Sequence, residues 1–160
     1  ATGNIASAID VASNSVLSGL TVSNTRTGGN AAAVDIVAGA TGATIRNNTI
    51  TAAGTTGPSM QMTALSVGSN FTVSGNTLNA SATGGGVSVA TGLAASNRTN
   101  VTVTGNTFNS TSAASNRSVS GNAVTSFVTA SSTGNVLTSG TCNAGAATGS
   151  VSFTNGTTCP

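Results

Sequence analysis

Residues 73–78 read Val-Ser-Gly-Asn-Thr-Leu, and the same pattern returns as Ile-Arg-Asn-Asn-Thr-Ile at 45–50 and as Val-Thr-Gly-Asn-Thr-Phe at 103–108. A related stretch precedes them at 17–22, and a weaker one follows at 137–142. In every copy the two apolar residues are five positions apart, and successive copies start 28 to 34 residues after one another. Self-similarity at such a period is typical of repeat proteins whose units stack on their neighbours.

A second apolar element lies between these copies. It reads Ala-Ile-Asp-Val-Ala at 8–12 and Ala-Val-Asp-Ile-Val at 33–37, with looser copies at 64–67, 87–89 and 151–153. Alternation of apolar and polar residues predicts β-strands, and the many Val, Ile and Thr residues favour strands as well. Each turn of the chain is therefore expected to hold one strand and then a strand–bend–strand unit.

The predicted bend carries glycine or asparagine at one position, as Gly19, Asn47, Gly75 and Gly105. These residue types tolerate a left-handed backbone, which suits a corner between two short strands. A single turn of this kind cannot bury its apolar side chains, so the turns must stack.

This type of repeat resembles the coils of the right-handed parallel β-helix superfamily, which includes pectate lyases and many surface proteins. The resemblance extends over most of residues 5–155. It implies an all-β chain, a right-handed parallel β-helix (β-solenoid) of about five coils, and we expect one domain over residues 1–160. It does not decide the activity, because this fold carries enzymes, adhesins, tail fibres and structural proteins alike.

Stacked coils place equivalent residues about 4.8 Å apart, so the repeats predict columns of like side chains. One inward column is Leu17, Ile45, Val73, Val103 and Leu137. The other is Val22, Ile50, Leu78, Phe108 and Cys142. A third column, Asn48, Asn76 and Asn106, falls at the bend. There we favour a structural role over ligand binding, because the backbone groups of a bend need hydrogen-bond partners.

Threonine recurs at one outward position of every coil. This candidate ligand-binding column is Thr21, Thr49, Thr77, Thr107 and Thr141. Two residues further on, the column is mixed: Ser23, Thr51, Asn79, Asn109 and Asn143. A flat threonine array resembles the ice-binding faces of some β-solenoid antifreeze proteins. The other interpretation is that threonine favours strands and pairs well across them.

Charged residues are scarce. They make up 4% of the chain, with a net charge of +2, and there is no lysine or histidine. The basic footprint of a nucleic-acid-binding protein is therefore missing. No apolar run approaches the about 20 residues that a membrane-spanning helix needs.

Asp10 and Asp35 occupy matching positions one coil apart. Two carboxylates about 5 Å apart are typical of retaining glycosidases, but they could also hold a cation or pair with an arginine. A glycosidase also needs a cleft with a general acid of raised pKa, and the sequence supplies no sugar-binding aromatic residues beside the pair. We predict a protein that is not an enzyme, with no catalytic residue, metal or cofactor.

The two cysteines, Cys142 and Cys159, lie near the C-terminal end of the sequence. Their spacing fits no zinc motif, so we predict a disulfide formed in an oxidising compartment; two free core thiols are the alternative. By the chain-entropy relation such a loop is worth about 3 kcal/mol. Asn97-Arg98 and Asn116-Arg117 both follow Ala-Ala-Ser, and we expect solvent-exposed loops there.

The first functional hypothesis is an extracellular or cell-surface structural protein, either a fibre subunit or an adhesin module. It would self-associate, head-to-tail or laterally, because the strand edges at the ends of an open solenoid recruit other chains; a host surface or glycan is a further expected partner. The alternatives are an ice-binding protein and a carbohydrate-binding or carbohydrate-cleaving β-helix.

Overall fold

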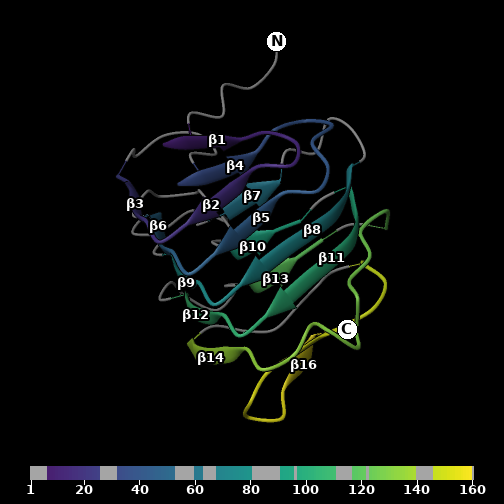
Figure 1. Cartoon of the computed structure of the whole chain (residues 1–160). Coiled ribbons are helices and arrows are strands. Elements are labelled where there is room, and N and C mark those ends of the chain that lie inside the picture. The colour runs from purple at the N-terminus through teal and green to yellow at the C-terminus, as the bar shows by residue number, and fades with distance from the viewer. Residues whose placement is uncertain are drawn as a thin grey trace.

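The computed structural model describes residues 7–25, 32–52, 60–62, 68–80, 91–95, 97–110, 117–121, 123–139 and 146–159. In this part of the chain every regular element is a strand (Figure 1). The strands form three parallel sheets and one antiparallel pair. The predicted all-β class is therefore confirmed.

The chain passes through the three sheets in turn. Sheet A contains β1 (Ile9–Val11), β4 (Val34–Ile36), β7 (Met60–Met62), β10 (Thr91–Ala94) and β13 (Arg117–Ser120). Sheet B contains β2 (Val16–Ser18), β5 (Thr44–Arg46), β8 (Gly68–Ser74) and β11 (Arg98–Thr104). Sheet C contains β3 (Thr21–Asn24), β6 (Thr49–Ala52), β9 (Thr77–Ala80), β12 (Thr107–Ser110) and β14 (Val136–Ser139).

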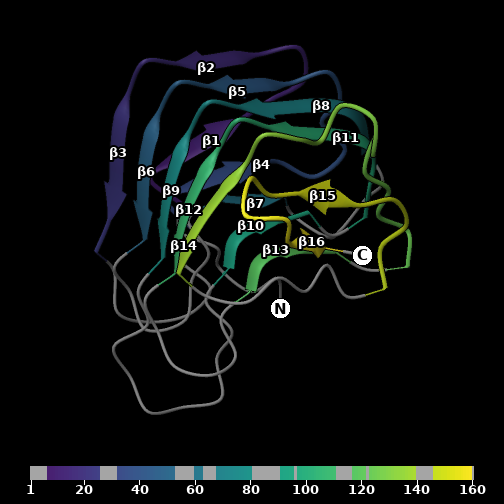
Figure 2. The same cartoon turned by 90° about the horizontal axis from the view of Figure 1, so that it is seen from below.

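Within each sheet, every strand pairs with the equivalent strand of the neighbouring turn. Figure 2 looks along the stack and shows the sheets as separate faces, with sheet B along the top and sheet C on the left. This arrangement of stacked parallel sheets is a β-solenoid.

The predicted inward columns are largely confirmed. Leu17, Ile45, Val73 and Val103 are consecutive register partners in sheet B. Val22, Ile50, Leu78 and Phe108 follow one another in sheet C. Sheet A adds the buried side chains of Val34, Ile36, Leu93 and Val119. The apolar core thus runs the length of the solenoid between the three sheets.

The fifth turn corrects the predicted register. Leu137 pairs with Phe108 rather than with Val103, so it continues the sheet C column to which Cys142 had been assigned. The predicted step of 34 residues is wrong, because Gly134 and Asn135 are the fifth-turn equivalents of the bend residues Gly105 and Asn106. Cys142 itself lies outside the described residues.

Left-handed residues mark the B–C corner of all five turns and the A–B corner of the first four. The B–C corner has φ between 54° and 72° at Gly19, Asn47, Gly75, Gly105 and Gly134. The A–B corner has φ between 54° and 69° at Asn14, Gly42, Asn70 and Asn100. The first column confirms the predicted bend, and the second uses the same two residue types for the same steric reason.

The Asn column at the B–C corner is a continuous hydrogen-bonded ladder. The backbone N and Nδ2 of Asn76 both donate to Oδ1 of Asn106, at 2.9 and 3.0 Å. Nδ2 of Asn76 also donates to the carbonyl of Ile45, at 2.9 Å. Asn48 and Asn106 repeat these contacts with their own neighbours. The structural role predicted for this column is confirmed, and Asn135 is a further member that the sequence analysis missed.

The two ends of the solenoid differ. At the C-terminal end, β15 (Val151–Ser152) and β16 (Thr158–Cys159) pair as an antiparallel hairpin below the fifth turn (Figure 1). Phe153 packs edge-on against Phe108, with ring centroids 5.7 Å apart. At the other end, β1, β2 and β3 are the terminal strands of their sheets. The hairpin therefore closes the core at one end, while β1, β2 and β3 are the outermost described strands at the other.

Candidate functional site

The predicted threonine column on sheet C is confirmed over four turns. Thr21, Thr49, Thr77 and Thr107 are consecutive register partners. In the fifth turn Val136, 37% exposed, stands opposite Thr107. The place predicted for Thr141 is therefore wrong; Thr141 itself lies outside the described residues.

The neighbouring column on sheet C is tied together by its own side chains. Nδ2 of Asn79 donates to Oγ1 of Thr51 at 3.1 Å, and Nδ2 of Asn109 donates to Oδ1 of Asn79 at 2.8 Å. The Thr138 hydroxyl donates in turn to Oδ1 of Asn109. Beyond Asn109 the register shifts, and Ser139 rather than Asn143 is its partner. The side chains of this column thus form hydrogen bonds with one another.

Sheet B carries a second threonine column that the sequence analysis missed. Thr44, Thr72 and Thr102 are register partners, and they point away from the core because Ile45, Val73 and Val103 beside them are buried. Ser18, Arg46, Ser74 and Thr104 form the next outward column. The signal was present as Thr-Val-Ser at 72–74 and Thr-Val-Thr at 102–104.

The acidic pair is in register, as predicted, but its two members have different surroundings. Asp10 pairs with Asp35 across β1 and β4. Asp10 is exposed and accepts a hydrogen bond from the Ser7 hydroxyl. Asp35 is buried, with 6% of its surface exposed, and interacts electrostatically with Arg98. Asp35 therefore interacts with an arginine, which is one of the alternatives to a catalytic role for the pair.

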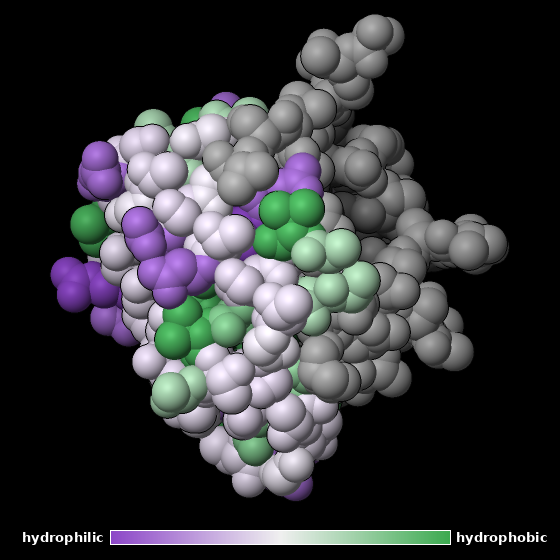
Figure 3. Space-filling model, turned by 90° about the vertical axis from the view of Figure 1, so that its right-hand side faces the viewer, coloured by the Kyte–Doolittle hydropathy of each residue, from purple (hydrophilic) through white to green (hydrophobic). Residues whose placement is uncertain are grey.

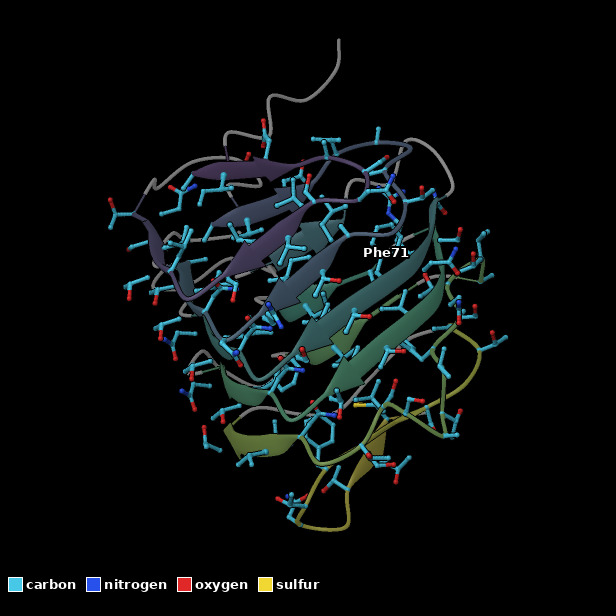
Figure 4. All side chains as sticks on the ribbon, viewed as in Figure 1. Phe71 is labelled. Atoms are coloured by element: carbon cyan, nitrogen blue, oxygen red, sulfur yellow. The ribbon has the colours of Figure 1, made fainter. Side chains whose placement is uncertain are left out.

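Arg98 is buried within the A–B corner, and the solvent loop predicted there is wrong. Nη2 donates to the carbonyl of Val37 at 3.1 Å and approaches that of Ile36 at 3.4 Å. The guanidinium lies over the ring of Phe71, 5.5 Å from its centroid; Figure 4 labels this ring in β8. Burial lowers the pKa of Arg98, and the nearby Asp35 carboxylate opposes this shift. Asn116 lies outside the described residues, as does the side chain of Arg117.

Gly68 makes room for this arginine. A Cβ at this position would lie 2.6 Å from Nη1 of Arg98 and 2.1 Å from the carbonyl oxygen of Ala40. Gly68 and Arg98 are register partners in adjacent turns. The side chain of Arg98 therefore passes the third turn at a glycine and reaches the second turn, where Ile36 and Val37 lie.

The surface near this corner is neither strongly apolar nor strongly charged. Figure 3 shows mostly pale residues, with small separate patches of purple and green. In the part of the chain that the structure describes, no three His, Cys, Asp or Glu side chains gather into a metal site. Nor do those residues include a helix long and apolar enough to cross a membrane.

The chain was compared with known proteins. Residues 2–152 match the family described as "Protein of unknown function (DUF1565)". Neither the search of curated proteins nor that of solved structures found a match. Because the matched region covers nearly the whole sequence, the chain belongs to the DUF1565 family.

Proposed function

We propose that the protein is a non-enzymatic structural module of the cell exterior, a right-handed parallel β-helix that associates through its N-terminal end. The handedness is supported by the path of the chain. In Figure 2 later turns lie nearer the viewer, and the chain runs counter-clockwise along sheet B and then sheet C. Crossovers between parallel strands are right-handed in nearly all sheets.

The observation that carries the proposal is the difference between the two ends. Among the described residues β1, β2 and β3 are the terminal strands of their sheets, and a terminal strand carries backbone donors and acceptors on its outer side. An apolar side chain stands beside them: Leu20 is 43% exposed, although its equivalents in later turns, Asn48 and Asn76, are buried. A second copy can satisfy both the strand edges and this apolar side chain.

The hairpin at the other end narrows the mode of association. Val151, Phe153 and Cys159 are buried there, so the core of the fifth turn is already covered. Head-to-tail stacking would have to displace these residues. We therefore favour a closed pair in which two N-terminal ends meet, since an isologous contact of this kind is self-complementary.

The position of Leu20 supports the same conclusion. Its backbone N donates to Oδ1 of Asn48 at 2.9 Å, so in the first turn Leu20 occupies the position that an asparagine of the ladder takes in later turns. A leucine side chain cannot accept the next hydrogen bond of the ladder. The ladder stops at Leu20, and an apolar contact suits this end better than a further turn of the same kind.

Light scattering after gel filtration, together with electron microscopy, tests the proposal. We expect pairs that meet end to end, and Leu20→Lys should convert them to single copies. Val124→Lys is the matched control, because Val124 is similarly exposed, at 46%, but belongs to the fifth turn. A wild-type protein that stays a single copy at high concentration would rule out association through this end.

A disulfide between Cys142 and Cys159 belongs to this proposal. It is supported by the burial of Cys159 opposite Val151 in the closing hairpin, where a tether would hold the hairpin against the fifth turn. Alkylation of the unreduced, unfolded protein followed by mass spectrometry should find no reactive thiol. Two alkylated cysteines would contradict the disulfide.

Ice binding is the second candidate function. It is favoured by the threonine columns, which follow the register of the strands on both sheet B and sheet C. Thermal hysteresis of purified protein tests it, and ice grown from the solution should incorporate the protein. Absence of both effects at millimolar protein would exclude this candidate.

A further inference from the structure

We infer that Asn155 is a site of spontaneous covalent modification, at which the side-chain amide leaves as ammonia and the residue becomes an aspartate or an isoaspartate. Asn155 lies in the turn between β15 and β16, within the hairpin that closes the C-terminal end of the solenoid. The co-reactant is water. The inference is independent of the association proposed for the N-terminal end.

The reaction joins two neighbouring residues, so the reacting groups are already held close together. The backbone N of Gly156 attacks Cγ of Asn155 and displaces Nδ2, which leaves with the Gly156 proton as ammonia. Water then opens the cyclic imide that has formed. Cleavage of the new bond between N and Cγ gives aspartate. Cleavage of the original peptide bond gives isoaspartate, in which the main chain runs through Cγ, and no atom is oxidised or reduced on either route.

The first argument is the residue that follows Asn155. Asn155 is the one asparagine of the sequence that precedes a glycine. Glycine has no Cβ to hinder the approach of its backbone N, and its φ and ψ are the least restricted of any residue. Gly156 has φ 85°, and a Cβ built on it would meet nothing within 4 Å. The space around Gly156 is therefore open.

The second argument is the contrast between Asn155 and the asparagines of the ladder. Asn76 and Asn106 are buried, and the Nδ2 atom of each donates to a backbone carbonyl of the preceding turn. Asn155 is exposed, and within the described part of the chain its one hydrogen bond is made through Oδ1. The leaving group of Asn155 is therefore open to water, whereas the amides of the ladder are held in the interior.

The third argument is a hydrogen-bond donor at the oxygen that gains charge during the attack. The backbone N of Thr157 donates to Oδ1 of Asn155 at 3.0 Å. Such a donor polarises the Cγ carbonyl and stabilises negative charge on Oδ1 in the tetrahedral intermediate.

One contact opposes the reaction. The backbone N of Gly156 donates to the carbonyl of Phe153 at 3.1 Å, and this hydrogen bond has to open before the attack. The strands β15 and β16 have two residues each. The hairpin can therefore open locally while the turns of the solenoid stay wound, as short exposed elements do.

The modification changes the hairpin. Isoaspartate adds a carbon to the main chain between Phe153 and Thr157, where N of Phe153 donates to the carbonyl of Thr157 at 2.9 Å. The longer main chain disturbs this pairing, whereas aspartate leaves the main chain as it was. The isoaspartate form should therefore unfold at a lower temperature than the aspartate form.

Incubation of the folded protein at mildly alkaline pH, in water enriched in heavy oxygen, tests the inference. Mass spectrometry of fragments should locate one heavy oxygen at residue 155, with more isoaspartate than aspartate, while Asn14 stays intact. Asn14 is the matched asparagine, because it is exposed at the A–B corner but precedes Ser15. Gly156→Ala should slow the conversion about tenfold, because its Cβ hinders the attack. Circular dichroism checks that the fold is kept during the incubation.

Each of the following results would overturn the inference. Aspartate without isoaspartate would mean that water attacks Cγ directly. Equal conversion at Asn14 would show that the glycine after Asn155 has no influence, and an unchanged rate in Gly156→Ala would exclude the backbone N of Gly156 from the reaction. If Gly156→Ala disturbs the turn, Gly156→Asn makes the same comparison, because asparagine tolerates a left-handed backbone.

Discussion

The two corners that flank sheet B are stabilised in different ways. At the B–C corner, one asparagine from each of four turns joins a ladder in which every side-chain amide donates to a backbone carbonyl of the preceding turn. At the A–B corner, the single side chain of Arg98 reaches the second turn from the fourth. The first device repeats along the stack, and the second occurs at one place in the described residues. The comparison shows that a solenoid can depend on both kinds of contact at once.

Substitution of Arg98 should lower the free energy of unfolding more than substitution of an asparagine in the ladder. Arg98→Met keeps much of the side-chain volume but leaves the carbonyl of Val37 and the carboxylate of Asp35 without the guanidinium. Breaking a buried charged contact by removing one partner costs about 4 kcal/mol. Urea unfolding measures this loss. Arg46→Met is the control, because Arg46 is exposed on sheet B; equal losses in both variants would show that the buried contacts of Arg98 contribute nothing special.

The Asn ladder should follow closely. Asn106→Ala removes the acceptor of the Asn76 backbone N and the donor to the Val73 carbonyl, both in the interior. Two buried groups left without partners cost about 3 kcal/mol together. The matched control is Asn79→Ala, because Asn79 bonds only to outward side chains of sheet C. We expect that variant to lose about 0.5 kcal/mol, and a comparable loss in the two would contradict the ladder's structural role.

Alanine substitutions of glycines compare the space available for a Cβ atom at the two corners. Gly68→Ala, at the A–B corner, should lose about 2 kcal/mol, because the added methyl meets backbone and the Arg98 guanidinium in a site that is already filled. Gly19→Ala, at the B–C corner, meets nothing within 4 Å. Its cost is only that of a left-handed backbone, about 1 kcal/mol. Thermal unfolding should rank the two in this order, and the reverse order would show that backbone strain outweighs crowding.

The smallest effect is expected from Gly105→Asn. Asn47 already holds the equivalent corner with φ 54°, and a Cβ at Gly105 has its nearest neighbour at 3.9 Å. The change in unfolding free energy should stay within about 0.5 kcal/mol. Gly105→Val is the contrasting variant, since a β-branched residue strongly resists φ near 63°. If Asn proves as damaging as Val, steric tolerance does not explain the residues found at this corner.

The contrast between the corners also explains what could be predicted from the sequence. The B–C corner repeats its residues, so the spacing of Gly75, Asn76 and their equivalents predicted the stacked turns, the bend and the ladder. In sheet A the predicted copies at 64–67 and 87–89 were misplaced, because Met60–Met62 and Thr91–Ala94 continue the strands instead, and 151–153 belongs to the closing hairpin. The register also failed in the fifth turn, where Leu137 had been aligned by apolar spacing alone. There the bend residues Gly134 and Asn135 decide the pairing, because an asparagine that left the ladder would orphan several buried groups.

Arg98 could not be predicted in the same way. Its partners lie about sixty residues earlier in the chain, and they are backbone carbonyls, which leave no mark in the sequence. The same holds for the threonine column of sheet B. Its residues were visible at 72–74 and 102–104, but their alignment with Thr44 depends on the pairing of the strands, which only the structure reveals.

The reach of Arg98 has a consequence for the order in which the protein folds. Its guanidinium finds the carbonyl of Val37 only after the second and third turns are wound, because the two residues are 61 positions apart. Contacts of such sequence separation form late and slow the folding of a chain. A nascent chain that has emerged only as far as the third turn would lack the contact between Arg98 and Val37. The formation of the fourth turn should therefore stabilise the stacking of the second and third turns.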